Sequence, residues 1–128
     1  MTVIPDKHTF TIWQGATFFE VLTLYETMNQ SSPRDLTDFS AEMIIRDKPK
    51  SENTYLTLAT TNNPAPSDDG CSITLQRDDA LGRIELKISA EATAIIPWKS
   101  AVYDLTITDT QNGVTDALLY GGIKVNGV

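Results

Sequence analysis

Apolar and polar residues alternate along much of this sequence, and helical spacing is almost absent. Alternation with a period of two sends successive side chains to opposite faces of an extended strand, so that one face can be buried and the other solvated. Segment 83–89 is the clearest case, because its apolar residues alternate with charged ones in the order Arg-Ile-Glu-Leu-Lys-Ile-Ser. A helix would scatter those charges around its circumference. The alternation therefore predicts a chain that is β from end to end.

The alternating runs are separated by turn-forming residues, and together they predict about eight strands. These cover residues 8–13, 16–25, 41–47, 55–60, 71–77, 83–89, 101–108 and 114–120, with the last continuing through 123–125. The Asn112-Gly113 pair is a strong hairpin signal and predicts a tight turn between the last two strands. Gly121-Gly122 predicts a bulge or bend in the final strand. One short helical turn is expected over 89–94, where Ser89 can act as the N-cap before Pro97 ends it.

Two polar stretches, 28–38 and 61–70, are predicted to be exposed loops, and the tip of the second is predicted to be the most mobile point. No amphipathic helix is available to cover a sheet face, so two sheets must pack together or close into a barrel. At 128 residues the chain is long enough to build one core without disulfides or metals. The prediction is a single all-β domain spanning 1–128.

The charge balance argues against a nucleic-acid partner. Ten Lys and Arg residues face 17 Asp and Glu residues, giving a formal net charge of −7 and a pI near 4.5, and such a field repels a phosphate backbone. No stretch approaches the ~20 apolar residues of a membrane span, and the first residues lack the features of a secretory signal. We therefore expect a soluble protein made in a cytoplasm, without a membrane partner.

Candidate catalytic groups are few. His8 is the only histidine and Cys71 the only cysteine. We therefore expect neither a Ser-His-Asp arrangement nor a metal site with a second imidazole, and Cys71 is expected in the core. The acidic pairs at 68–69 and 78–79 lie in turn-like sequence, where aspartates usually bond to their own backbone. A calcium site could use such loops, although the spacing of an EF-hand is absent. We expect no enzyme activity, no cofactor and no metal.

Two aromatic residues stand out. Most rings fall in strand patterns and are expected in the core, but Trp98 lies in a connecting Pro-Trp-Lys segment and is the best candidate for a surface ring. An exposed ring could hold a sugar, which makes a carbohydrate-binding module one alternative. Tyr103 begins a Tyr-x-Leu pattern in the penultimate strand and resembles the tyrosine corner of immunoglobulin-like sandwiches.

Six short motifs follow one another along the chain: 12–18 (IWQGATF), 33–37 (PRDLT), 41–46 (AEMIIR), 82–86 (GRIEL), 103–107 (YDLTI) and 118–125 (LLYGGIKV). Their order resembles that of the small immunoglobulin-like structural proteins of tailed bacteriophages. The same order is similar to the N-terminal domain of baseplate upper proteins, which anchor receptor-binding proteins. The resemblance covers nearly the whole chain and implies an immunoglobulin-like antiparallel β-sandwich. Baseplate upper proteins carry a long further region after this domain, whereas this chain ends at Val128, so fibre anchoring is not carried over.

The resemblance implies a structural role in a virion, as a neck, tail or baseplate adaptor that acts through protein–protein assembly. Other virion proteins would be the partners, the chain would form a homo-oligomer within the assembly, and the host bacterial cytoplasm would be the place of synthesis. The candidate assembly segment lies ahead of the first strand and consists of Thr2, Val3, Ile4, Pro5, Asp6 and Lys7. The alternatives are a capsid decoration protein and a free-standing module that binds carbohydrate or protein.

Overall fold

The computed structural model of the chain describes residues 6–23, 38–75 and 83–127. Within these ranges the chain forms nine strands and one short helix. The elements are β1 (Asp6–Lys7), β2 (Phe10–Trp13), β3 (Phe18–Thr23), β4 (Phe39–Arg46), β5 (Thr54–Ala59), β6 (Cys71–Leu75), β7 (Arg83–Ile88), α1 (Ala90–Ala94), β8 (Ser100–Asp109) and β9 (Thr115–Asn126). The predicted loop at 28–37, the acidic pair at 78–79 and the predicted strand ends at 24–25 and 76–77 lie outside the described residues.

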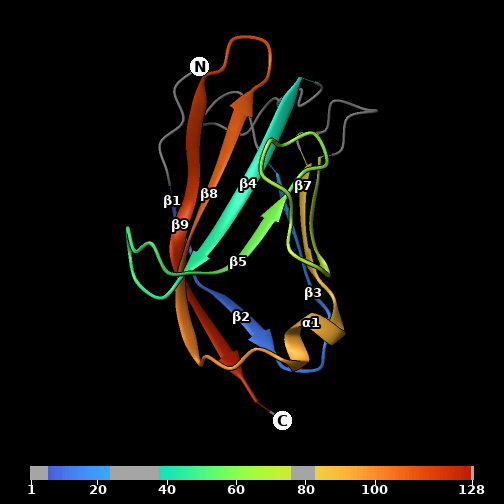
Figure 1. The fold of residues 1–128 in the computed structure, drawn as a ribbon, viewed down its shortest axis with the longest axis vertical. Coiled ribbons are helices and arrows are strands. Elements are labelled where there is room, and N and C mark those ends of the chain that lie inside the picture. The colour runs from blue at the N-terminus through green and yellow to red at the C-terminus, as the bar shows by residue number, and fades with distance from the viewer. Residues whose placement is uncertain (1–5, 24–37, 76–82, 128) are drawn as a thin grey trace.

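The strands form two sheets that pack face to face (Figure 1). In the six-stranded sheet β1 and β2 both pair with β9, and β8, β4 and β5 follow in that order, whereas the three-stranded sheet has the order β3-β7-β6. The ladders are antiparallel except those of β1 and β2, which run parallel to β9. The order β3-β7-β6 corresponds to strands B-E-D of an immunoglobulin-like domain, and β9-β8-β4-β5 corresponds to strands G-F-C-C′, while β1 and β2 pair with the last strand. The predicted sandwich is confirmed.

The core lies between the sheets and is built from alternate side chains. In β7 the predicted inward residues Ile84, Leu86 and Ile88 are each at most 1% exposed, while Arg83 and Lys87 face solvent. The inward face of β8 is buried in the same way, as its alternation predicted. Burying one such aliphatic side chain is worth roughly 1.5–3 kcal/mol. The alternation therefore supplies both the register and most of the driving force.

Helix α1 connects β7 to β8 and so bridges the two sheets at one end of the sandwich. The Ser89 hydroxyl caps it by accepting a hydrogen bond from the Ala92 amide at 3.1 Å, which confirms the predicted helical turn. Thr93, a residue of the helix, is fully buried, and its hydroxyl donates to the Ala16 carbonyl at 2.8 Å and accepts from the Gly15 amide at 3.1 Å. The helix therefore fixes the turn between β2 and β3. This helix, the one in the described ranges, is far too short to cross a membrane.

The last two strands form the predicted hairpin. Gly113 adopts a φ of +73°, and the Asp109 amide donates to the Val114 carbonyl at 2.8 Å across the turn. The bulge, however, does not lie at Gly121-Gly122 as predicted. The register between β8 and β9 shifts between Leu105 and Thr106, where Leu118 is the extra residue on β9.

Gly121 is required for a different reason. A Cβ atom there would collide with the backbone carbonyl of His8, which lies between β1 and β2. The glycine therefore makes room for the N-terminal backbone to lie against β9.

Candidate functional site

The candidate catalytic residues are far apart in the sandwich. His8 adjoins β1 at the edge beyond β9, and its amide donates to the Tyr120 carbonyl at 2.9 Å. Cys71 begins β6, which forms the opposite edge of the other sheet and lies beside β5. Because Phe18 of β3 packs against Phe10 of β2, the two sheets are aligned so that β6 and the N-terminal strands occupy opposite sides. A Cys-His pair is therefore not formed.

The environment of Cys71 keeps it a thiol. The side chain is 6% exposed, as predicted for a core residue, and burial raises the pKa of the thiol to about 11, with further contributions from Asp68 and Asp69. A thiol with this pKa is a poor nucleophile at neutral pH. The Asp68 and Asp69 side chains are exposed, and Asp68 accepts a hydrogen bond from the Thr57 amide at 2.8 Å. Within the described ranges no group of three or more His, Cys, Asp or Glu residues is arranged to hold a metal ion.

The end of the candidate assembly segment is already paired within the chain. Asp6 and Lys7 form β1 and lie opposite Leu119 and Tyr120 of β9, whereas residues 2–5 are outside the described part. These two residues therefore belong to the first strand, whereas the segment was expected to lie ahead of it. The next strand, β2, continues along β9 from Phe10 to Trp13.

Tyr103 secures this N-terminal edge. Its ring is 2% exposed and its hydroxyl donates to the His8 carbonyl at 2.7 Å. In a tyrosine corner the hydroxyl bonds to the backbone a few residues upstream, but here the acceptor lies 95 positions earlier in the chain. Tyr103 therefore fastens the first strand to the penultimate one, and this is not the geometry of a tyrosine corner. Burial also raises the pKa of its hydroxyl, which keeps the group a donor.

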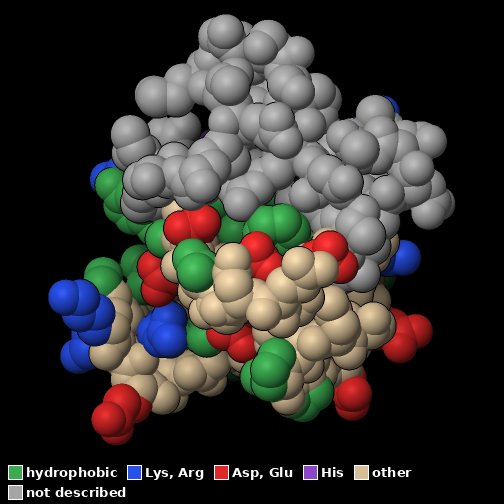
Figure 2. Space-filling view, turned by 90° about the horizontal axis from the view of Figure 1, so that it is seen from above, with side chains coloured by type: hydrophobic (Ala, Val, Ile, Leu, Met, Phe, Trp, Pro, Cys, Tyr) green, Lys and Arg blue, Asp and Glu red, His purple; other side chains and the backbone are tan. Residues whose placement is uncertain are grey.

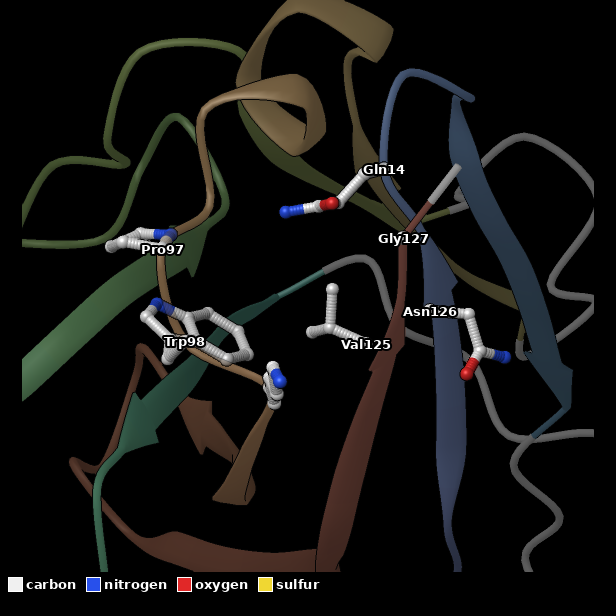
Figure 3. Close-up of a pocket in the computed structure, with 7 residues that line it drawn as sticks. Gln14, Pro97, Trp98, Val125, Asn126 and Gly127 are labelled. Atoms are coloured by element: carbon white, nitrogen blue, oxygen red, sulfur yellow. The ribbon is translucent and has the colours of Figure 1, made fainter.

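Trp98 is only half-buried, but it is not a free surface ring. It stacks on Tyr55 with ring centroids 4.9 Å apart and an interplanar angle of 8°. Trp98 also lines a cavity of about 310 Å³, together with Gln14, Pro97, Lys99 and residues 125–127. Figure 3 shows Trp98 and Val125 facing each other across this cavity, while the Asn126 side chain points away from it.

One polar side chain of this cavity, that of Gln14, is committed to the fold. The Gln14 amide nitrogen donates to the Ile96 carbonyl at 2.7 Å, which ties the β2–β3 turn to the segment after α1. Lys99 is the one charged residue of the lining. The volume lies at the lower end of the range for small-molecule sites, and such sites need several convergent polar groups. The cavity is therefore a weak ligand site.

Three rings in strand patterns, which were expected in the core, are exposed instead. Trp13 is 55% exposed, Phe19 53% and Tyr120 44%. A signal for two of them is present in the alternation. Phe18 and Phe19 are adjacent, so only one can face the core, and Trp13 follows the inward Ile12 by one residue.

One lateral side of the sandwich is covered by its own loop. Ser67 accepts a hydrogen bond from the Ala59 amide at 2.6 Å and donates to the Ala59 carbonyl at 2.9 Å. Asp68 binds Thr57 in the same two-sided way. Its carboxylate accepts a hydrogen bond from the Thr57 amide at 2.8 Å, and its own amide donates to the Thr57 carbonyl at 2.9 Å. The loop 61–70 is exposed as predicted, but it is fastened to the edge of β5 at these points. It thereby occupies backbone groups that an incoming strand would use.

The other lateral side is open in the described part of the structure. β3 pairs with β7 alone, and no described segment lies along its outer edge. Phe19 and Val21 project from the outer face of β3 and are 53% and 47% exposed. Seen from the end that carries the β8–β9 hairpin, acidic side chains spread across the middle of the described surface and basic ones lie mainly at its sides (Figure 2). An unpaired edge with two exposed apolar side chains is the feature best suited to bind another polypeptide.

A scan against models of known protein families finds no match, and a search of curated proteins finds none either.

Proposed function

We propose that this protein is a structural component of a tailed bacteriophage virion, a neck, tail or baseplate adaptor that acts through protein–protein assembly. The observation that carries the proposal is the outer edge of β3, which no other described strand pairs with and on which Phe19 and Val21 are exposed. The motif order that resembles immunoglobulin-like phage structural proteins supports the particular setting. The immunoglobulin-like sandwich agrees with that resemblance.

The mechanism is one of shape and of edge pairing. The core and the fastened turns make the sandwich a rigid body, because α1 and Thr93 hold one end and the Tyr103 bond holds the N-terminal strand. A rigid body presents the same edge to every neighbour. Main-chain hydrogen bonds then give affinity, and the side chains on alternate faces give specificity. No catalytic step belongs to this function.

Quantitative mass spectrometry of purified virions tests the proposal by counting copies of this chain against the major capsid protein. A low copy number, on the scale of a six- or twelve-fold ring, supports a symmetric adaptor. Hundreds of copies identify a capsid decoration protein instead. Complete absence from particles overturns the structural role.

A free-standing binding module is the second candidate, and the half-buried Trp98 beside its cavity is the observation that favours it. A glycan panel is the appropriate measurement, with Trp98→Ala compared against Tyr120→Ala, which removes an exposed ring elsewhere. Binding that is lost only in the Trp98 variant would support this candidate. Binding that both variants retain, or that both variants lose, counts against this candidate.

A further inference from the structure

The outer edge of β3 combines exposed apolar side chains with one charge. Phe19 and Val21 lie on the outer face of the sheet, opposite Lys87 and Glu85 of β7. Glu20 lies between them on the core-facing side, opposite the fully buried Leu86, and yet it is exposed. An edge strand with an inward-pointing charge is a recognised device against indiscriminate pairing.

Glu20 disfavours pairing of this edge with a second copy of the chain. In an antiparallel pair, residues directly opposite each other point to the same face of the sheet. When two copies of β3 pair with their cores on the same face, even-numbered residues therefore meet even-numbered ones and odd-numbered residues meet odd-numbered ones. In the three central registers Glu20 would face Glu20, Phe18 or Leu22 of the other copy. The first pairs like charges, and the others place a carboxylate against an apolar side chain.

The same residues define a different occupant. A strand added to β3 would place two alternate side chains beside Phe19 and Val21 and the side chain between them beside Glu20. Apolar residues suit the first two positions, and a basic residue suits the middle one. An extended segment with the local pattern apolar–basic–apolar therefore matches this edge in both polarity and charge.

We propose that β3 binds an extended segment of another polypeptide that carries a Lys or Arg between two apolar residues, and that Glu20 selects for the basic residue. This inference rests on the proposed function, because it names the kind of segment through which the adaptor would contact a neighbouring protein. Selection works by attraction of the right partner and by repulsion of acidic strands and of a second copy. The net charge of −7 adds a general attraction for basic partners.

Two synthetic peptides test the proposal directly. Each is about eight residues long, the length of an ordinary strand, with Thr in the flanks and a central Val-Lys-Val in one and Val-Glu-Val in the other. Binding is followed by NMR titration of the full chain, reading the amide signals of β3. We expect the Lys peptide to bind about three- to tenfold more tightly than the Glu peptide, as cross-strand charge pairs allow. The preference should shrink at high salt, because the pair is exposed.

Three variants make the test specific. Glu20→Lys should reverse the preference between the peptides, whereas Glu52→Lys makes the same charge change in an exposed loop of the other sheet and should leave it unaltered. Phe19→Ser should weaken both peptides equally. Failure of both peptides to shift the β3 signals of the wild-type protein overturns the proposal, and so does an unchanged preference in Glu20→Lys.

Particle incorporation separates this inference from the proposed function. If the Glu20→Lys and Phe19→Ser proteins enter virions at the wild-type copy number, the edge is not the contact surface, and the adaptor role stands without it. If the wild-type protein itself is absent from virions, the proposed function fails, while selective peptide binding would still support β3 as the edge that accepts a basic strand.

Discussion

Two edge strands on opposite lateral sides of the sandwich, β5 and β3, are treated in opposite ways. On one side Ser67 and Asp68 occupy backbone groups of β5. On the other, β3 shows no partner beyond β7 in the described part of the chain and exposes Phe19 and Val21. If a bare edge were only a by-product of the fold, both sides would be expected to look alike. The contrast indicates that one edge is protected and the other is available.

The N-terminal edge of the six-stranded sheet lies on the open side and is protected in a third way. There the chain covers β9 with its own first strands, using the space at Gly121 and the hydroxyl of Tyr103. Three of the four sheet edges thus have three distinct treatments: a loop at β5, the first strands at β9 and exposure at β3. Each can be altered by one substitution.

Gly121→Ala should have the largest effect, a loss of about 3 kcal/mol in the free energy of unfolding, because the new methyl group collides with the His8 carbonyl. Urea unfolding measures the loss, and hydrogen exchange should show β1 and β2 opening first. Gly122→Ala is the matched control, since a Cβ there is 3.8 Å from the Ala101 carbonyl, an ordinary contact. Equal losses in the two variants would mean that the N-terminal edge does not depend on this close approach.

Tyr103→Phe should cost about 2 kcal/mol, because it keeps the buried ring but leaves the His8 carbonyl without its donor. Faster amide exchange in β1 and β2, with little change in β3 and β7, would locate the effect at the N-terminal edge. The exposed Tyr120→Phe serves as the comparison and should be nearly neutral. A uniform increase in exchange across both sheets would argue against a local fastening.

Ser67→Ala should cost about 1 kcal/mol, since it removes one acceptor and one donor from Ala59 at the β5 edge. Exposing that edge should also raise self-association, which sedimentation velocity detects. The exposed Ser100→Ala provides the control. If Ser67→Ala loses stability but remains as monomeric as the wild type, the loop supports the fold without guarding the edge.

Phe19→Ser should change the free energy of unfolding by no more than about 0.5 kcal/mol, because an exposed ring contributes little to the fold. The urea midpoint measures it. A loss well above 1 kcal/mol would show that Phe19 packs against the protein itself, and the contrast between the two lateral sides would then disappear.

Local chemistry was sufficient to predict much of the fold. The alternation placed Ile84, Leu86 and Ile88 in the core, Ser89 identified the start of α1, and Asn112-Gly113 identified the last hairpin. In each case the signal and its structural consequence lie within a few residues of one another. The site was less accessible to this reasoning, because the partner of Tyr103 is 95 positions away and the rings of Trp98 and Tyr55 meet only in the folded chain.

The sequence by itself determined that the chain is all-β, where most strands run and which face of β7 and β8 is buried, because side-chain alternation is a property of neighbouring residues. The tertiary structure alone decided which edges are covered. That outcome depends on where loop 61–70, the first strands and β3 come to lie relative to strands far away in sequence. Edge exposure is a property of how the sheets are assembled, and no local pattern encodes it.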